Sequence, residues 1–246
     1  MTAAISSSAG KALHTLKCIC DHAEPSSLAD IARMTGYPRT VTLRMVNTLV
    51  SHGLVERCPD RRVYSATLDL LHMVQKALRR DPLLGRVELI LRELAERTGD
   101  TASFMVRRGD SAVVIRRVEG SALIRVGGSR EGMELPLHCG GAPFALLAFS
   151  DKAVIDAYLA KPLERRTQAS ITDPDTLRRR IAEARACGYT VGDEDLFQYI
   201  IAVGVPVQDE RVGLVGAISV GNIQQRYPPG RAEEVGRILI ETIARF

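Results

Sequence analysis

Basic and hydroxyl side chains gather in one short stretch near the start of the chain. Five residues that follow Pro38 are candidates for contacting double-stranded DNA: Arg39, Thr40, Thr42, Leu43 and Arg44. An arginine can make a bidentate contact to guanine, and a threonine can bond a base or a phosphate. We expect Arg61 and Arg62, further along the chain, to add contacts to the backbone or minor groove. A single arginine is as readily a solvated charge, so the hypothesis depends on the cluster.

A second candidate site lies at Cys139–Pro143, where two glycines precede a proline. Pro143 is expected to open a helix, and the glycines before it leave backbone N–H groups free and let a ligand approach closely. A carboxylate or another anion would suit that end. We therefore expect Gly140 and Gly141 to contact a small molecule, with a plain turn as the alternative.

Small residues alternate along the expected strand 214–220. Ser219 shares one strand face with Ala217 and Gly221, because side chains two apart point the same way. Such a face leaves room for a ligand, although close sheet packing needs the same residue sizes. The candidate apolar walls of a pocket are Met105, Leu123 and Phe144.

His138 and Cys139 could suggest a metal site or a nucleophile. No second histidine stands near this lone pair in the sequence, so packing or pocket lining is the better interpretation. The chain also lacks the GxSxG, Gly-Lys-Ser/Thr, HExxH and GxGxxG motifs. We expect no catalytic residue, no metal and no cofactor; an enzyme that turns over its ligand is the rival hypothesis.

Composition bounds the remaining possibilities. A chain of 246 residues is long enough for two domains. Its longest apolar stretches are far shorter than the roughly 20 residues of a membrane helix. Five scattered cysteines predict reduced thiols and a cytoplasmic protein. Residues 1–67 hold eight Lys and Arg against five Asp and Glu, so the small positive excess lies where a polyanion-binding domain is expected.

The elements around the first cluster are those of a winged helix-turn-helix. Apolar spacing predicts helices over 10–23, from Ser26 or Ser27 to Gly36, and from Pro38 to Gly53. Two short alternating runs, 54–57 and 62–66, predict a hairpin. We assign residues 1–67 to this DNA-binding domain.

Two amphipathic helices are expected to follow, together forming a linker over residues 68–98. They could carry a dimer contact or pack on their own domain. From residue 99 to 246 the expected strands are 101–108, 112–118, 122–126, 189–192, 200–207 and 214–220. Helices are expected at 143–149, 151–159, 173–187 and 230–246. This order predicts an α+β domain with an antiparallel sheet.

The chain resembles the IclR family of bacterial transcription regulators from about Gly10 to Phe246. In the first domain the resemblance rests on Gly36–Arg44, Leu49 and Gly53–Arg57. In the second it rests on Leu135–Cys139, Ala145–Ala148, Gly188-Tyr189, Asp193, Pro206-Val207 and Ala217–Val220. It implies a GAF-like effector-binding domain, a small organic effector, and a homodimer or homotetramer that binds a near-palindromic operator. It also implies polar pocket positions at Asp193 and Ser219, and Ala202 occupies a matching place on the neighbouring strand.

Three departures from the family pattern fall in the expected pocket. The usual Thr-Ala-x-Gly-Lys is here Gly140–Phe144, a common glycine is Tyr199, and a common alanine is Gly204. We therefore carry over no effector from a relative. The rivals are a GntR-like regulator, which the expected strands disfavour, and a sensor whose first domain docks a protein. Our hypothesis is that an effector changes the packing of the effector-binding domain and thereby the spacing between the two DNA-binding domains of a dimer.

Overall fold

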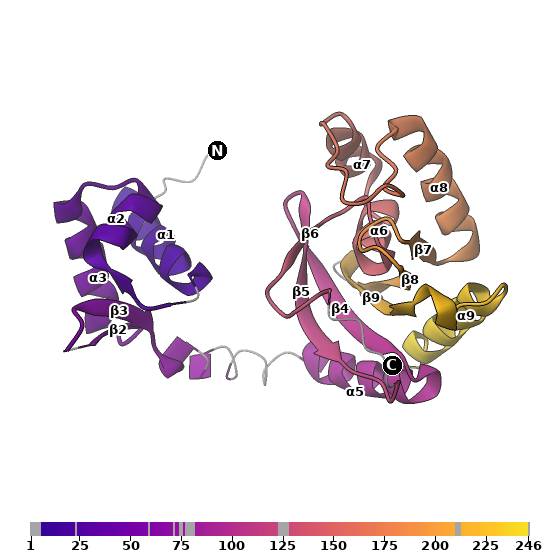
Figure 1. Ribbon diagram of the computed structural model, residues 1–246, viewed down its shortest axis with the longest axis horizontal. Helices are drawn as coiled ribbons and strands as arrows, with labels where there is room; N and C mark the ends of the chain where they lie inside the picture. Colours follow the sequence, from indigo (N-terminus) through magenta and orange to yellow (C-terminus); the bar gives the residue numbers. More distant parts are fainter. Residues whose placement is uncertain are drawn as a thin grey trace. The chain divides into compact units, whose positions relative to one another are not determined.

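The computed structural model describes residues 6–22, 24–58, 60–70, 72–73, 76, 82–122, 128–209 and 213–245. The chain divides into two compact units, Met1–Pro82 and Leu83–Phe246, each visible in Figure 1. Among the helices in these ranges, none is long and apolar enough to cross a membrane.

The first unit is a winged helix-turn-helix, as predicted. It contains α1 (Ser7–Asp21), α2 (Leu28–Thr35), α3 (Arg39–Ser51) and a sheet in the order β1 (Ser26–Ser27), β3 (Val63–Ala66), β2 (Val55–Cys58). A capping box between Ser27 and Asp30 starts α2, and Gly36, at φ 69°, ends it. The core is formed by Ile19, Ile31, Val46, Leu49, Val55 and Tyr64. The two-residue strand β1 was not predicted, because so short a strand has no periodicity.

The second unit is built on one antiparallel six-stranded sheet in the order β6-β5-β4-β9-β8-β7 (Figure 1). The strands are β4 (Thr101–Arg108), β5 (Ser111–Val118), β6 (Glu134–Pro136), β7 (Thr190–Asp193), β8 (Ile200–Asp209) and β9 (Gly213–Ile223). The α-helices are α5 (Pro82–Thr98), α6 (Gly141–Ala148), α7 (Lys152–Leu159), α8 (Pro174–Cys187) and α9 (Arg231–Ile243). The α+β prediction is confirmed.

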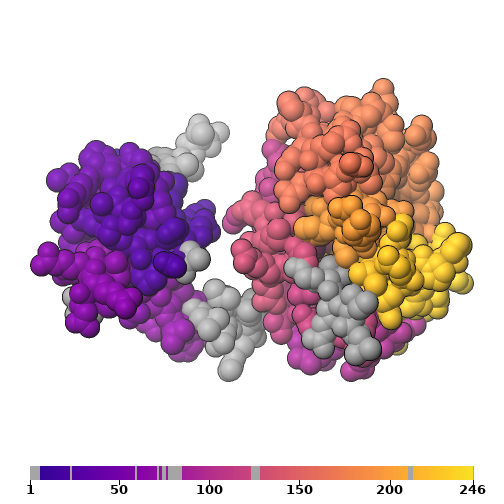
Figure 2. All heavy atoms as spheres, viewed as in Figure 1, coloured from indigo at the N-terminus to yellow at the C-terminus, as the bar shows by residue number. Residues whose placement is uncertain are grey.

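The two faces of this sheet have different partners. Helices α5 and α9 cover one face through an apolar layer that includes Leu91, Val203 and Leu239. Helix α6 covers the other face and is fully buried. Helices α7 and α8 lie side by side beyond it, joined by an ion pair of 2.6 Å between Asp156 and Arg178 (Figures 1 and 2). The sheet therefore separates two hydrophobic cores, one on each of its faces.

The expected linker divides at the boundary between the units. The apolar residues of α5 pack in the second unit's own core, which is one of the two roles expected for the linker helices. Most of the predicted helix before it, and all of the predicted strand 122–126 except Ala122, lie outside the described residues. Ala122 itself is not in a strand.

Candidate functional site

The solvent-facing side of α3 carries most of the first cluster. Arg39, Thr40, Leu43 and Arg44 are exposed. The last three line a shallow depression together with Asn47, Thr48 and Ser51. These positions recur three and four residues apart, so they form one stripe along the helix. The stripe joins hydrogen-bonding groups to one apolar side chain, Leu43, which is 40% exposed.

Thr42 does not belong to this stripe, and its assignment as a DNA contact is wrong. Its side chain is completely buried. Its hydroxyl donates to the Pro38 carbonyl at 3.2 Å. The reason is helical phase: Thr42 precedes Met45 by three residues and Val46 by four, and both of these side chains are buried.

The wing places two more cations at the surface. Arg61 and Arg62 lie between β2 and β3 and are exposed; Arg62 adopts φ 51°. Within the described part of the chain, neither of them nor Arg39 or Arg44 has a carboxylate within 4.0 Å. Exposed arginines without an ion pair to a described carboxylate suit binding to a polyanion.

The second unit contains a cavity between the sheet and the start of α6. It encloses about 530 Å³ counting its open mouth, but only about 50 Å³ admits the centre of a water molecule. It is therefore narrow. Its lining residues are Thr101, Ser103, Met105, Ser129, Leu135, Gly140, Gly141, Pro143, Gly192, Asp195, Leu196, Phe197, Ile200, Ala202, Ser219 and Gly221.

The floor of the cavity is a sheet face made of small and hydroxyl residues. Strand register sets Ser103 opposite Ser219 on β4 and β9, and Ser219 opposite Gly204 on β8. The next row along the strands runs Thr101, Gly221, Ala202, Gly192. Short side chains in both rows keep the floor low and leave room above it for a ligand.

Glycines let the loop before α6 lie directly on this floor. A Cβ on Gly192 would fall 2.3 Å from Cα of Gly140, which is far inside van der Waals contact. Gly140 has φ 76°, a conformation that favours glycine. Thr190 holds the loop down, because its hydroxyl lies 2.9 Å from the Gly141 carbonyl and 3.1 Å from the Gly204 carbonyl.

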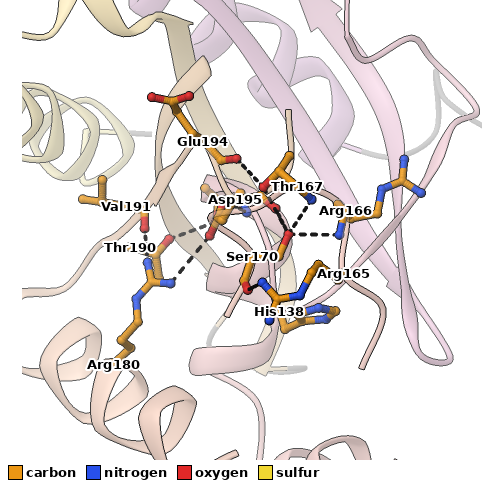
Figure 3. Close-up of polar contacts among 12 residues, drawn as sticks. His138, Arg165, Arg166, Thr167, Ser170, Arg180, Thr190, Val191, Glu194 and Asp195 are labelled. Atoms are coloured by element: carbon orange, nitrogen blue, oxygen red, sulfur yellow. Dashed lines mark hydrogen bonds and ion pairs between the residues drawn. The ribbon is translucent and has the colours of Figure 1, made fainter. Parts of the chain in front are cut away.

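One carboxylate, that of Asp195, meets this loop from the segment after β7. Asp195 is 3% exposed, and its Oδ1 accepts the Gly140 N–H at 2.9 Å. Arg180 of α8 approaches Oδ2 at 3.5 Å, and the Ser170 hydroxyl donates to the Asp195 carbonyl at 2.6 Å (Figure 3). Burial raises the pKa of this carboxyl, while the Gly140 N–H and Arg180 act against that rise.

Two family models together match most of the chain. The model of the IclR C-terminal domain matches residues 75–245, and the IclR helix-turn-helix model matches residues 8–59. The chain belongs to the IclR family. It is therefore a transcriptional regulator with an N-terminal helix-turn-helix domain.

Three relatives show how far the likeness extends. The repressor AllR of Klebsiella pneumoniae is 28% identical over 88% of this chain and 80% of its own. The IclR regulator of Alicyclobacillus acidocaldarius has a TM-score of 0.88 and 26% identity, covering 98% of both chains. An IclR homologue of Microbacterium hydrocarbonoxydans, solved with 4-hydroxybenzoate, has a TM-score of 0.82 and 22% identity, covering 96% of this chain and 97% of its own.

The cavity contains six of the nine predicted pocket residues of this IclR protein. These are Met105, Gly140, Gly141, Ala202, Ser219 and Gly221. Leu123 lies outside the described residues. The expectation of free amides in the loop is wrong for Gly140, since its N–H is donated to Asp195.

Phe144 and Asp193 are not in the cavity, so those two assignments are corrected. Phe144 is buried in the core on α6, with the Arg180 guanidinium 4.9 Å from its ring centre. Asp193 is exposed and borders a second, polar groove beside residues 164–169, which adjoins the cavity at Leu196 and Phe197. Asp195 takes the place expected for Asp193, and sequence periodicity could not reveal this because β7 ends at Asp193 and Glu194 turns at φ 55°.

The His138–Cys139 pair has a packing role in the structure. His138 Nδ1 lies 2.8 Å from the Tyr158 hydroxyl, and its Nε2 lies 2.9 Å from the Glu164 carbonyl. Cys139 is buried, and burial raises the pKa of its thiol to about 12. Within the described ranges, no three His, Cys, Asp or Glu side chains gather in a way that could hold a metal.

Proposed function

We propose that this IclR-family protein is a cytoplasmic, ligand-responsive repressor that reads an operator with α3 and senses a small organic acid in the cavity beside α6. The main support for DNA binding is the exposed stripe on α3 with two arginines that no described carboxylate neutralises. AllR, a relative of similar architecture, is a repressor, and this favours repression as the output.

The first unit would bind DNA in the usual way of a helix-turn-helix domain. The start of α3 enters the major groove, where Arg39 and Arg44 bond guanine edges and Thr40 bonds a base or phosphate. Arg61 and Arg62 of the wing contact the backbone or the minor groove. A single DNA-binding domain of this size binds weakly, so a homodimer or homotetramer on a near-palindromic operator is expected.

The effector would bind without being turned over. The hydroxyls of Thr101, Ser103 and Ser219 can donate to its carboxylate, and Met105 and Leu135 offer apolar contacts. One relative was solved with 4-hydroxybenzoate, which is a small organic acid. Binding of the effector in the cavity then shifts the packing of the second unit. Through the linker segment 68–98 this changes the spacing between the DNA-binding domains of a dimer.

The test is binding of the full-length protein to DNA from upstream of its own gene and to scrambled DNA, across a salt series. We expect preferential binding that weakens with salt. Arg39→Ala and Arg44→Ala should each weaken it by about 1–3 kcal/mol, or roughly 5- to 150-fold. Arg178→Ala, a matched change on α8, should have no effect. Equal affinity for both DNAs at every salt concentration would contradict the assignment.

A further inference from the structure

Asp195 is the one charged side chain among the described residues that line the cavity. It is 3% exposed. It lies in the connection between β7 and β8 and contacts the loop before α6, whereas the hydroxyl side chains of the cavity come from strands β4 and β9. A buried charge requires compensation by hydrogen bonds or by an opposite charge. The state of its two oxygens therefore indicates which ligand groups the cavity can accept.

The two oxygens are unequally satisfied. Oδ1 accepts the Gly140 N–H, whereas Oδ2 accepts no hydrogen bond from any described residue. The nearest cation, Arg180, is 3.5 Å from Oδ2; its other terminal nitrogen donates to the Val191 carbonyl. A carboxylate can accept about four hydrogen bonds, so Asp195 retains unused acceptor capacity.

Asp195 also changes the electrostatic character of the α6 terminus. Gly140 is the N-cap of α6, and such a helix end attracts anions. Here the chain's own carboxylate already takes the Gly140 N–H. A ligand carboxylate at the same place would meet a like charge in a poorly solvated site, which is unfavourable. The loop end of the cavity thus disfavours the anion that its glycines alone would suggest.

The opposite end of the cavity has the reverse polarity. Ser103 and Ser219 face each other on neighbouring strands, and Thr101 lies two residues from Ser103 on β4. Their hydroxyls can donate to a ligand. Strand β9 lies two strands from β7, which corresponds to about 10 Å between backbones. A small molecule can therefore address both ends at once.

We infer that Asp195 recognises a hydrogen-bond donor of the effector, a hydroxyl or an ammonium group, while Ser103 and Ser219 bond its carboxylate. The effector class is an aromatic acid, or an aliphatic acid of similar length, with a donor group at the far end from its carboxylate. This inference rests on the proposed function only in taking the cavity as the effector site.

Matched acids that differ by one donor group test this inference. Isothermal titration of the full-length protein compares benzoate, 4-hydroxybenzoate and 4-aminomethylbenzoate. A hydrogen bond to a charged acceptor contributes about 1.5–3 kcal/mol, so we expect a donor-bearing member to bind at least about tenfold more tightly than its parent. Comparison of 4-hydroxybenzoate with 4-aminomethylbenzoate shows whether the site prefers a hydroxyl or an ammonium donor.

Three variants assign the preference to its residue. Asp195→Asn should remove it, and Asp193→Asn, the same change at an exposed position outside the cavity, should retain it. Ser103→Ala should weaken every acid in a series alike and leave the preference intact. If Asp195→Asn does not fold, the comparison of each donor-bearing acid with its parent on the native protein still decides the inference.

Two outcomes overturn the inference. One is that no donor-bearing acid binds more tightly than its parent. The other is that the preference survives in folded Asp195→Asn. Operator binding measured on the same preparation separates the two proposals: DNA preference without donor preference rejects only this inference, and donor preference without DNA preference rejects only the proposed regulator.

Discussion

The backbones of Gly141 and Gly204 touch: a Cβ on Gly204 would lie 2.3 Å from the Gly141 carbonyl carbon. Both positions are departures from the usual family pattern, which has alanine at each. A Cβ on Gly141 would in turn lie 2.9 Å from the Val203 carbonyl carbon. The two glycines therefore act together, since each removes a methyl group from the same contact and lets the loop before α6 rest on β8.

Restoring one of these methyl groups should destabilise the second unit. Gly204→Ala inserts a Cβ where backbone atoms of Gly141 already lie, and overpacking of this kind costs typically about 1–3 kcal/mol. We expect the free energy of unfolding to fall by that amount. Because the chain has no tryptophan, urea unfolding is best followed by circular dichroism.

The control for this prediction is Gly85→Ala on α5. A Cβ at Gly85 meets nothing within 4 Å, and alanine is preferred to glycine within a helix by about 0.5–1 kcal/mol. The control should therefore stabilise the protein slightly. A Gly204→Ala protein as stable as the control would mean that the loop moves away at no cost.

Tyr199 is held in a backbone conformation that suits glycine. Its φ is 63°, and its side chain is 57% exposed. The left-handed region costs a residue with a Cβ about 1–2 kcal/mol, so we expect Tyr199→Gly to be more stable than Tyr199→Ala by about 1 kcal/mol. The neighbouring exposed residue Gln198, which has no positive φ, should show the ordinary order, with alanine above glycine. Thermal unfolding of the four variants measures both differences, and the same order at both positions would contradict the strain.

The same substitution at two neighbouring threonines should separate DNA reading from folding. Thr40→Val removes an exposed hydroxyl from the α3 stripe, so operator affinity should fall a few-fold, by about 0.5–1.5 kcal/mol, with stability unchanged. Thr42→Val removes the bond to the Pro38 carbonyl inside the core and should lower the free energy of unfolding by about 1 kcal/mol. Its operator affinity should be retained. Loss of DNA binding by folded Thr42→Val would restore Thr42 to the reading surface.

Periodicity predicted most of the described helices and strands but not the short strands β1 and β6, and tertiary contacts decided the site. Strand β4 has the predicted bounds, and α8 begins one residue after the predicted start, because both carry regular patterns with clear terminal residues. Ser219 and Gly221 were found because strand alternation fixes which face they share. Sequence periodicity could not reveal Asp195, because its place depends on the turn at Glu194 and on Gly140 in a distant loop. Thr42 was misassigned because the buried face of α3 also includes Thr42 and Val46, beside the expected Met45 and Leu49.

His138 should make the stability of the protein depend on pH below about neutrality. The Leu137 N–H donates to the Tyr158 hydroxyl at 3.0 Å, which leaves that hydroxyl to donate to Nδ1 of His138. The Nε2–H then donates to the Glu164 carbonyl. This arrangement needs the neutral imidazole, and burial lowers the pKa of His138 from its usual value of 6.5.

The sign of the effect follows from proton binding. Between the lowered pKa of folded His138 and 6.5, the unfolded chain binds more protons than the folded one, so stability rises with pH across this window. The contribution is complete above 6.5 and is lost as the pH falls, by at most about 1.4 kcal/mol per pH unit. Urea unfolding at pH 7.5 and 5.5 should show a smaller difference for His138→Gln than for the native chain. An identical pH dependence in His138→Gln and the native chain would mean that His138 is protonated within the fold at no cost.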